Sequence, residues 1–194
     1  MYLGEIARIK MGLVLSRKKA EIDLEAVAEY PMISLKNIQE DGTFTEDPVE
    51  SFKSKEIIGN EFFTREGNIL VRLSHPNTAV LIDKEQEGLL IPSYFANVEI
   101  IDTNVLPGYV AWYLNTDKVK GELLKSQTGT HIPSTNKQIL EKISIPELDL
   151  SKQQMITELQ QLYRKEKRLY QKLMAEKEKF YKAVTYSIIK MNEG

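Results

Sequence analysis

The side chains that most often carry catalysis are scarce in this sequence. There are two histidines, His75 and His131, and neither stands at a spacing that pairs it with carboxylates for a metal site or a catalytic triad. Cysteine is absent, which excludes disulfides and thiolate metal ligands. The glycines form no phosphate-binding loop and no dinucleotide fingerprint, and there is no Asn-Pro-Pro-aromatic tetrapeptide of the kind that amino-methyltransferases use. We therefore expect a non-catalytic chain that holds no cofactor and no metal of its own.

Charge is distributed unevenly along the chain. Residues 1–150 hold 16 Lys and Arg against 23 Asp and Glu, a net charge of −7, whereas residues 151–194 hold 10 against 5, a net charge of +5. The one basic neighbourhood of the first half is formed by residues 17–19 (RKK) with Arg8 and Lys10. An acidic globular part is a poor non-specific binder of polyanions. Binding to a nucleic acid would therefore depend on local patches or on partners that bring positive charge.

Short extended segments separated by turns precede the helical segments. Residues 3–10 are typical of a short helical turn that runs into a first strand. Turn residues and apolar runs predict further strands at 30–38, 69–73, 78–83 and 94–101. A helical pair is expected over 107–125 and a short helix over 134–142. Because strands come first and no βαβ repeat is present, the pattern indicates an α+β fold with a mixed or antiparallel sheet.

A long C-terminal helix is predicted over 151–190, where forty residues pass without Pro or Gly. Ser151 and Gln154 have the spacing of a capping box at its start. Apolar residues then recur every three or four positions, and Glu166, Lys177 and Ser187 occupy the remaining positions of the same seam. The apolar seam residues are Ile156, Leu159, Tyr163, Tyr170, Leu173, Phe180 and Val184. An overlapping stripe runs through Leu159, Leu162, Leu169, Leu173, Phe180 and Ala183.

This helix would be about 60 Å long at 1.5 Å per residue, which is longer than a domain of this size can cover. A coiled coil with another helix is therefore expected, and folding back onto the chain's own globular part is the alternative. No stretch is long and apolar enough to span a membrane, and the N-terminus lacks the pattern of a signal peptide. We expect a cytoplasmic protein.

The order of short motifs resembles the specificity subunit of Type I restriction–modification systems. Residues 3–7 (LGEIA), followed by Gly12, are similar to the family's opening strand, and residues 30–38 (YPMISLKNI) are similar to its proline-then-strand segment. Residues 64–72 (TREGNILVR) resemble its turn-then-strand stretch, with Asn68 where an aspartate is usual. The order and spacing of these motifs carry the resemblance across the whole chain.

The most specific likeness lies at the end of the globular part. Residues 129–133 (GTHIP) and 140–146 (LEKISIP), with Gln154 and Ile156 opening the long helix, follow the family's pattern. Subunits of the family hold two target-recognition domains, each followed by a long helix, and the two helices pack antiparallel as a spacer. This chain has the length of one domain and one helix, and it looks like a half subunit.

The resemblance implies three parts: a DNA-reading target-recognition domain at 1–150, a dimerisation and spacer coiled coil at 151–190, and a tail at 191–194. It implies a homodimer through antiparallel C-terminal helices, acting on a bipartite inverted repeat in double-stranded DNA. The implied partners are methyltransferase (M) subunits and, where the system has them, restriction (R) subunits. S-adenosylmethionine and ATP would be bound by those partners.

Major-groove readout favours Arg, Lys, Asn, Gln, Ser and Thr on loops, because these side chains match the donors and acceptors of base edges. The candidates for DNA contact are Arg17, Lys18, Lys36, Asn37, Arg72, Ser74, His75, Thr128, Thr130 and His131. The loops at 72–75 and 128–131 rank first because they follow ordered elements. Lys53 and Lys55 rank low because an irregular polar loop is expected there.

A coiled-coil protein-interaction module, whose globular domain binds a protein instead of DNA, is the alternative function. The net acidity of residues 1–150 favours it. For each DNA candidate taken singly, an ordinary solvated loop residue is the competing interpretation. Charge reversals at Arg72 and Lys36 would separate the two functions, because they should abolish specific DNA binding only under the first.

Overall fold

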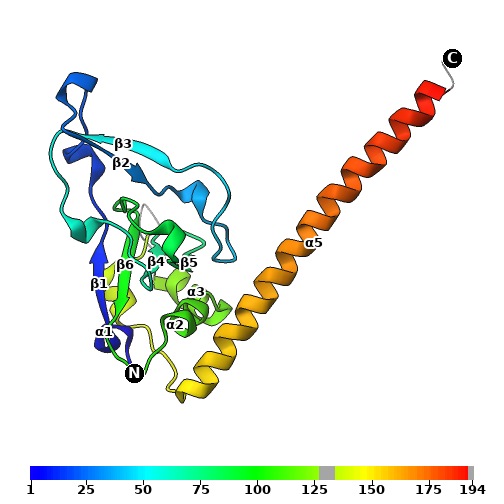
Figure 1. Cartoon of the computed structure of the whole chain (residues 1–194). Coiled ribbons are helices and arrows are strands. Elements are labelled where there is room, and N and C mark those ends of the chain that lie inside the picture. The colour runs from blue at the N-terminus through cyan, green and yellow to red at the C-terminus, as the bar shows by residue number, and fades with distance from the viewer. Residues whose placement is uncertain (127–133, 192–194) are drawn as a thin grey trace. The chain divides into compact units, whose positions relative to one another are not determined.

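The computed structural model describes residues 1–126 and 134–191, which belong to two compact units (Figure 1). The globular unit spans Met1–Gln154 and the helical unit spans Met155–Gly194. Strands and short helices build the globular unit, whereas one helix makes up the described part of the helical unit. The α+β class with a long C-terminal helix, predicted from the sequence, is confirmed.

A four-stranded antiparallel sheet forms the centre of the globular unit. Its strands, in spatial order, are β1 (Ala7–Met11), β6 (Phe95–Ile100), β4 (Ile69–Arg72) and β5 (Ala79–Leu81). The register sets Ile9 and Ile69 on either side of Val98, and all three are buried. Because successive side chains of a strand point to opposite faces, Lys10 and Asn97 belong to the other face. That second face is polar at its β1 side.

The helices α2 (Pro107–Leu114) and α3 (Asp117–Ser126) follow the sheet strands in the chain. Pro107 stands in the first turn of α2, where its fixed φ and missing N–H are tolerated. Asn115, directly after α2, accepts a hydrogen bond from the Ala79 N–H (3.1 Å) and donates one to the Ala79 carbonyl (2.6 Å). These bonds attach α2 to β5 and satisfy backbone groups that an edge strand would otherwise leave open.

A second antiparallel pair consists of β2 (Ala28–Met32) and β3 (Glu50–Ser54). Met32 and Phe52 from this pair enter a core cluster that also holds Leu90. The described connections contain short 3-10 helices: η1 (Leu15–Arg17), η2 (Asp23–Glu25), η3 (Leu35–Asn37), η4 (Asn60–Phe62) and η5 (Lys84–Gln86). The strand predicted at 30–38 is therefore too long, since β2 ends at Met32.

The first residues of the chain pair with the segment that leads into the last helix. α1 (Leu3–Ile6) begins where the Leu3 N–H donates to the Ile143 carbonyl (2.9 Å), and the Ile145 N–H donates to the Met1 carbonyl (2.9 Å). α4 (Lys137–Glu141) precedes this segment, and the Tyr109 hydroxyl donates to the Pro146 carbonyl (3.0 Å). The segment between α4 and the long helix is thus held by backbone and side-chain bonds.

The long helix α5 (Leu150–Met191) begins one residue before the predicted Ser151. Asp149 caps it, because the Asp149 carboxylate accepts a hydrogen bond from the Lys152 N–H (2.9 Å). The predicted capping box at Ser151 is therefore wrong. The hydrogen bond and the charge of the Lys152 side chain hold the pKa of Asp149 below its usual value.

Gln153 anchors the first turn of α5 within the globular unit. Its side chain is fully buried, and its Oε1 accepts a hydrogen bond from the Leu106 N–H (2.8 Å). Its Nε2 donates to the carbonyls of Asn104 (2.9 Å) and Leu148 (2.8 Å). One polar side chain thus satisfies three backbone groups, and it ties the helix start to the residues before α2.

Candidate nucleic-acid interface

The turn between β4 and β5 gathers three of the predicted DNA-contacting residues. Arg72 ends β4, and its Nε donates a hydrogen bond to the Ser74 hydroxyl (3.1 Å). The Asn77 N–H closes the turn on the Ser74 carbonyl (2.9 Å), and the Asn77 side chain donates to the Leu73 carbonyl (2.8 Å). His75 is exposed at this turn. The turn is therefore held by its own hydrogen bonds, and it presents a guanidinium, a hydroxyl and an imidazole within four residues.

The chain passes beside this turn again at Ser134. Ser134 forms an antiparallel bridge with Ser74, and the Thr135 N–H donates to the Leu73 carbonyl (2.8 Å). Three further predicted contact residues, Thr128, Thr130 and His131, lie outside the described residues. Ser134 is thus the polar residue that the structure adds to this turn.

Lys36 and Asn37 are adjacent in the sequence and differ in environment. Lys36 is exposed in η3 and its ammonium lies 3.0 Å from the Glu50 carboxylate. Asn37 is buried, and its Oδ1 accepts from the Ser34 N–H (2.9 Å) while its Nδ2 donates to the Asp47 carbonyl (3.2 Å). The Asn37 amide is occupied inside the fold, where it positions the connection from η3 to β3.

Arg17 and Lys18 lie at the end of η1, which is distant in the sequence from the β4–β5 turn. Lys18 forms an ion pair with Glu56, which follows β3. Arg17 is exposed and has no ion pair within the described parts of the chain. The ion pair of Lys36 is with Glu50, the first residue of β3, whereas the ion pair of Lys18 is with Glu56, which lies beyond the last residue of β3. The structure therefore separates these two lysines along β3 instead of joining them in one patch.

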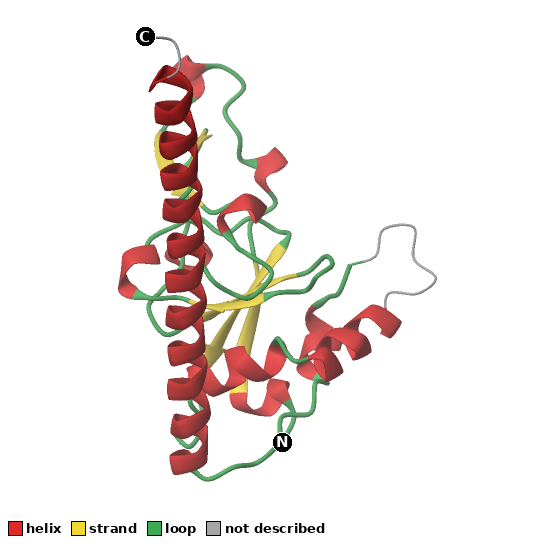
Figure 2. Cartoon of the chain, turned by 90° about the vertical axis from the view of Figure 1, so that its right-hand side faces the viewer, coloured by secondary structure: helices red, strands yellow, loops and turns green. Residues whose placement is uncertain are grey.

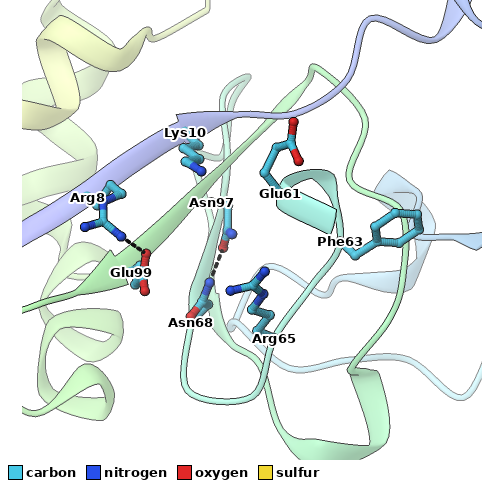
Figure 3. A pocket seen from close by; sticks show the side chains of 8 residues that line it. All are labelled: Arg8, Lys10, Glu61, Phe63, Arg65, Asn68, Asn97 and Glu99. Atoms are coloured by element: carbon cyan, nitrogen blue, oxygen red, sulfur yellow. Dashed lines mark hydrogen bonds and ion pairs between the residues drawn. The ribbon is translucent and has the colours of Figure 1, made fainter. Parts of the chain in front are cut away.

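A polar pocket on the second face of the sheet was not predicted (Figure 3). It measures about 80 Å³ and is lined by Arg8, Lys10, Glu61, Phe63, Arg65, Asn68, Asn97 and Glu99. The Arg8 guanidinium lies 3.0 Å from the Glu99 carboxylate, and the Asn68 Nδ2 donates to the Asn97 Oδ1 (3.2 Å). The alternation of Arg8 and Lys10 along β1 was a signal for this face, but Arg65 and Asn68 reach it only through the fold.

The apolar stripe of α5 is open to solvent in the single chain. Leu159 is 67% exposed and Phe180 is 66% exposed, and Tyr163, Tyr170 and Leu173 are also exposed. The helix that carries this stripe is unbroken from Leu150 to Met191 (Figure 2). No helix in residues 1–126 and 134–191 has the length and apolar character needed to cross a lipid bilayer. The stripe therefore presents a large apolar surface on an otherwise charged helix.

Several solved structures resemble this fold, among them the three that follow. The HsdS subunit from Thermoanaerobacter tengcongensis matches with a TM-score of 0.66 and 15% identity, over 91% of this chain and 44% of that chain. The Type-I restriction-modification system S subunit from M. genitalium matches with a TM-score of 0.55 and 14% identity, over 91% of this chain and 41% of that chain. A chain from work on complex assembly and conformational transition of the type I R-M system matches with a TM-score of 0.59 and 14% identity, over 91% of this chain and 40% of that chain.

This chain thus spans about two fifths of the length of these structural relatives, which fits a single-domain form. No curated protein matches the sequence. A family model described as the Type I restriction modification DNA specificity domain matches residues 1–179, which include the globular unit and most of α5. The chain belongs to the family of Type I restriction–modification DNA specificity domains.

Proposed function

We propose that this chain reads a DNA sequence as a non-catalytic specificity component of a Type I modification complex. The match of one specificity-domain model to residues 1–179 carries this proposal, because it spans both the DNA-reading part and the helix expected to join two copies. The catalytic activities belong to partner subunits: S-adenosylmethionine is bound by the methyltransferase subunits, and ATP by restriction subunits where the system has them.

The β4–β5 turn is the reading surface that the geometry supports best. The bond from Arg72 Nε to Ser74 orients the guanidinium, and the terminal nitrogens of Arg72 make no hydrogen bond to the described residues. An oriented arginine suits the bidentate contact with the O6 and N7 atoms of guanine in the major groove. Ser74 and His75 lie beside it and can reach neighbouring base edges or phosphates.

The net charge of −7 on residues 1–150 shapes how this recognition works. Phosphate contacts by Lys and Arg supply most of the affinity of DNA-binding proteins, and an acidic domain offers few of them. The methyltransferase subunits then provide the non-specific affinity, whereas this chain selects the bases. The isolated chain accordingly binds DNA weakly, and the assembled complex binds it tightly.

Two copies of the chain form a homodimer through α5, with the helices antiparallel and the globular units at opposite ends. The support is the exposed apolar stripe, which a second helix of the same kind would cover. Such a dimer has two-fold symmetry, so its two identical reading surfaces contact the DNA in opposite orientations along the duplex. The target is therefore a bipartite inverted repeat with a fixed gap.

A complex reconstituted with the methyltransferase subunit tests the reading surface. Arg72→Ala should lower the affinity for the cognate target by about 10- to 100-fold, because one bidentate base contact is worth about 1–3 kcal/mol. Lys84→Ala is the matched control: Lys84 is exposed in η5, which follows β5 and lies beyond the end of the β4–β5 hairpin opposite the turn. Equal affinities of the two variants would refute the role of the turn.

A globular domain that binds a protein instead of DNA is the second candidate, and one observation favours it. The connection around η2 exposes Ile22, Leu24 and Val27, with Leu24 95% exposed, among the carboxylates Glu21 and Glu25. An apolar patch with acidic neighbours suits a protein surface better than a phosphate backbone. If Leu24→Ser abolished assembly with the methyltransferase subunit while Arg72→Ala left DNA selection unchanged, this second function would hold.

A further inference from the structure

The stripe of α5 contains two charged residues among its apolar ones. In the seam predicted from 3-4 spacing, Glu166 and Lys177 stand between exposed apolar side chains. A charge at a seam position is costly if it meets an apolar residue and favourable if it meets the opposite charge. The positions of these two charges therefore limit how a partner helix can pair with α5.

The seam maps onto itself when the helix is reversed. If the residue numbers are reflected through the midpoint between Gln171 and Lys172, every seam residue falls opposite another seam residue. The resulting pairs are Ile156 with Ser187, Leu159 with Val184, Tyr163 with Phe180, Glu166 with Lys177, and Tyr170 with Leu173. The two charges thus face each other, and apolar residues fill the layers beside them.

Other registers of the same seam lose this match. A shift by one heptad in either direction sets Lys177 against Leu159 or Leu173, and it sets Glu166 against Tyr170 or Val184. A parallel pair would set each charge against its own copy. Such pairings bury a charge against an apolar side chain or beside a like charge, and both are destabilising.

The overlapping stripe through Leu162 and Leu169 is excluded by the same reasoning. When two copies of that stripe are paired antiparallel about Gln171, Leu162 falls opposite Phe180 and Glu166 falls opposite Glu176. Two carboxylates would then meet in each of two layers, and like charges in contact repel. The leucines of this stripe instead flank the first seam and widen the apolar surface that the pairing covers.

We propose that a second copy of this chain covers α5 in one antiparallel register, centred between Gln171 and Lys172. Two ion pairs join Glu166 of one copy to Lys177 of the partner subunit and lie about 8 Å on either side of the two-fold axis, at 1.5 Å per residue. The proposal rests on the homodimer of the proposed function and adds its register and the residues that select it.

Cysteine cross-linking tests the register directly, because the chain has no cysteine of its own. The double variant Glu166→Cys/Lys177→Cys is oxidised mildly and run on a denaturing gel without reductant. Within one helix the two positions are about 16 Å apart, so they cannot form an internal disulfide. The single variants Glu166→Cys and Lys177→Cys are matched controls, since the same distance of about 16 Å separates their two copies in the proposed dimer.

The double variant should form a covalent dimer, and each single variant should stay monomeric on the gel. Cross-linking of the single variants would indicate a parallel pair and overturn the proposal. A double variant that is not cross-linked, although light scattering of the parent chain gives twice 22.3 kDa, would overturn the register alone. A parent chain that is monomeric at all concentrations would overturn the dimer, and the Arg72 experiment would still test DNA reading independently.

Charge exchange gives a second readout that needs no disulfide. Glu166→Lys or Lys177→Glu alone should raise the dissociation constant of the dimer at least about tenfold, because each creates two like-charge contacts. The double variant Glu166→Lys/Lys177→Glu should restore dimerisation, since the two charges only change places. Failure of the double variant to recover, with helicity unchanged by circular dichroism, would contradict the pairing.

Discussion

Gln153 should control how firmly α5 is attached to the globular unit. Replacing it with alanine removes one acceptor and two donor contacts, which leaves the Leu106 N–H and the carbonyls of Asn104 and Leu148 without this partner. At about 1 kcal/mol for each lost hydrogen bond, Gln153→Ala should lower the free energy of unfolding of the globular unit by about 3 kcal/mol. For a chain of this size that corresponds to a fall in Tm of about 6–12 °C.

The single tryptophan provides the assay. Trp112 lies in α2, which begins after Leu106, so its fluorescence during urea denaturation reports the unfolding of the globular unit. Gln171→Ala is the matched control, because Gln171 is an exposed glutamine within the same helix. Surface substitutions usually change the free energy of unfolding by no more than about 0.5 kcal/mol. If the free energy of unfolding of Gln153→Ala lay within that range of the parent value, the anchoring role assigned to Gln153 would be wrong.

Three further substitutions test other parts of the fold. Asn115→Ala should lower the free energy of unfolding by about 1–3 kcal/mol, because β5 loses both bonds to Ala79, and urea denaturation measures it. Asn37→Ala should also lower the free energy of unfolding by about 1–3 kcal/mol, because the buried backbone groups that the Asn37 amide contacts lose their hydrogen-bond partner. An unchanged midpoint of urea denaturation would contradict this. The folded pKa of Asp149 is lowered, so its contribution to stability is complete above its unfolded pKa and is lost as pH falls through the lowered value. Asparagine keeps a capping oxygen but carries no charge, so the difference in Tm between the parent chain and Asp149→Asn reports the charge of Asp149. This difference should therefore shrink on acidification, and a difference that grew would refute the stabilising role of that charge.

The long helix and the sheet strands could be predicted from local pattern. Forty residues of 3-4 apolar spacing without Pro or Gly leave few alternatives to a helix, and apolar runs such as residues 69–73 leave few alternatives to a buried strand. β3 was missed because only Phe52 among its five residues is a large apolar one. β3 is a strand because its backbone pairs with β2, and the residues of β3 themselves carry no local pattern that indicates this pairing.

The candidate site was predictable only where local structure decides exposure. His75 was expected on a loop and lies exposed on a turn. Asn37 was expected at the surface, but the connection from η3 to β3 folds over it and uses its amide. Gln153 and Asn68 gain their roles from residues distant in the chain, and no spacing within the sequence indicates such contacts.

The most direct test of the central claim is the methylation pattern that a reconstituted complex leaves on DNA. This chain and its methyltransferase subunit are incubated with S-adenosylmethionine and a random-sequence library, and the methylated positions are mapped at base resolution. The proposed function predicts one inverted repeat, with two identical half-sites in opposite orientation and a constant gap. Methylation without sequence preference would contradict the reading role, and two unlike half-sites would contradict the symmetric dimer.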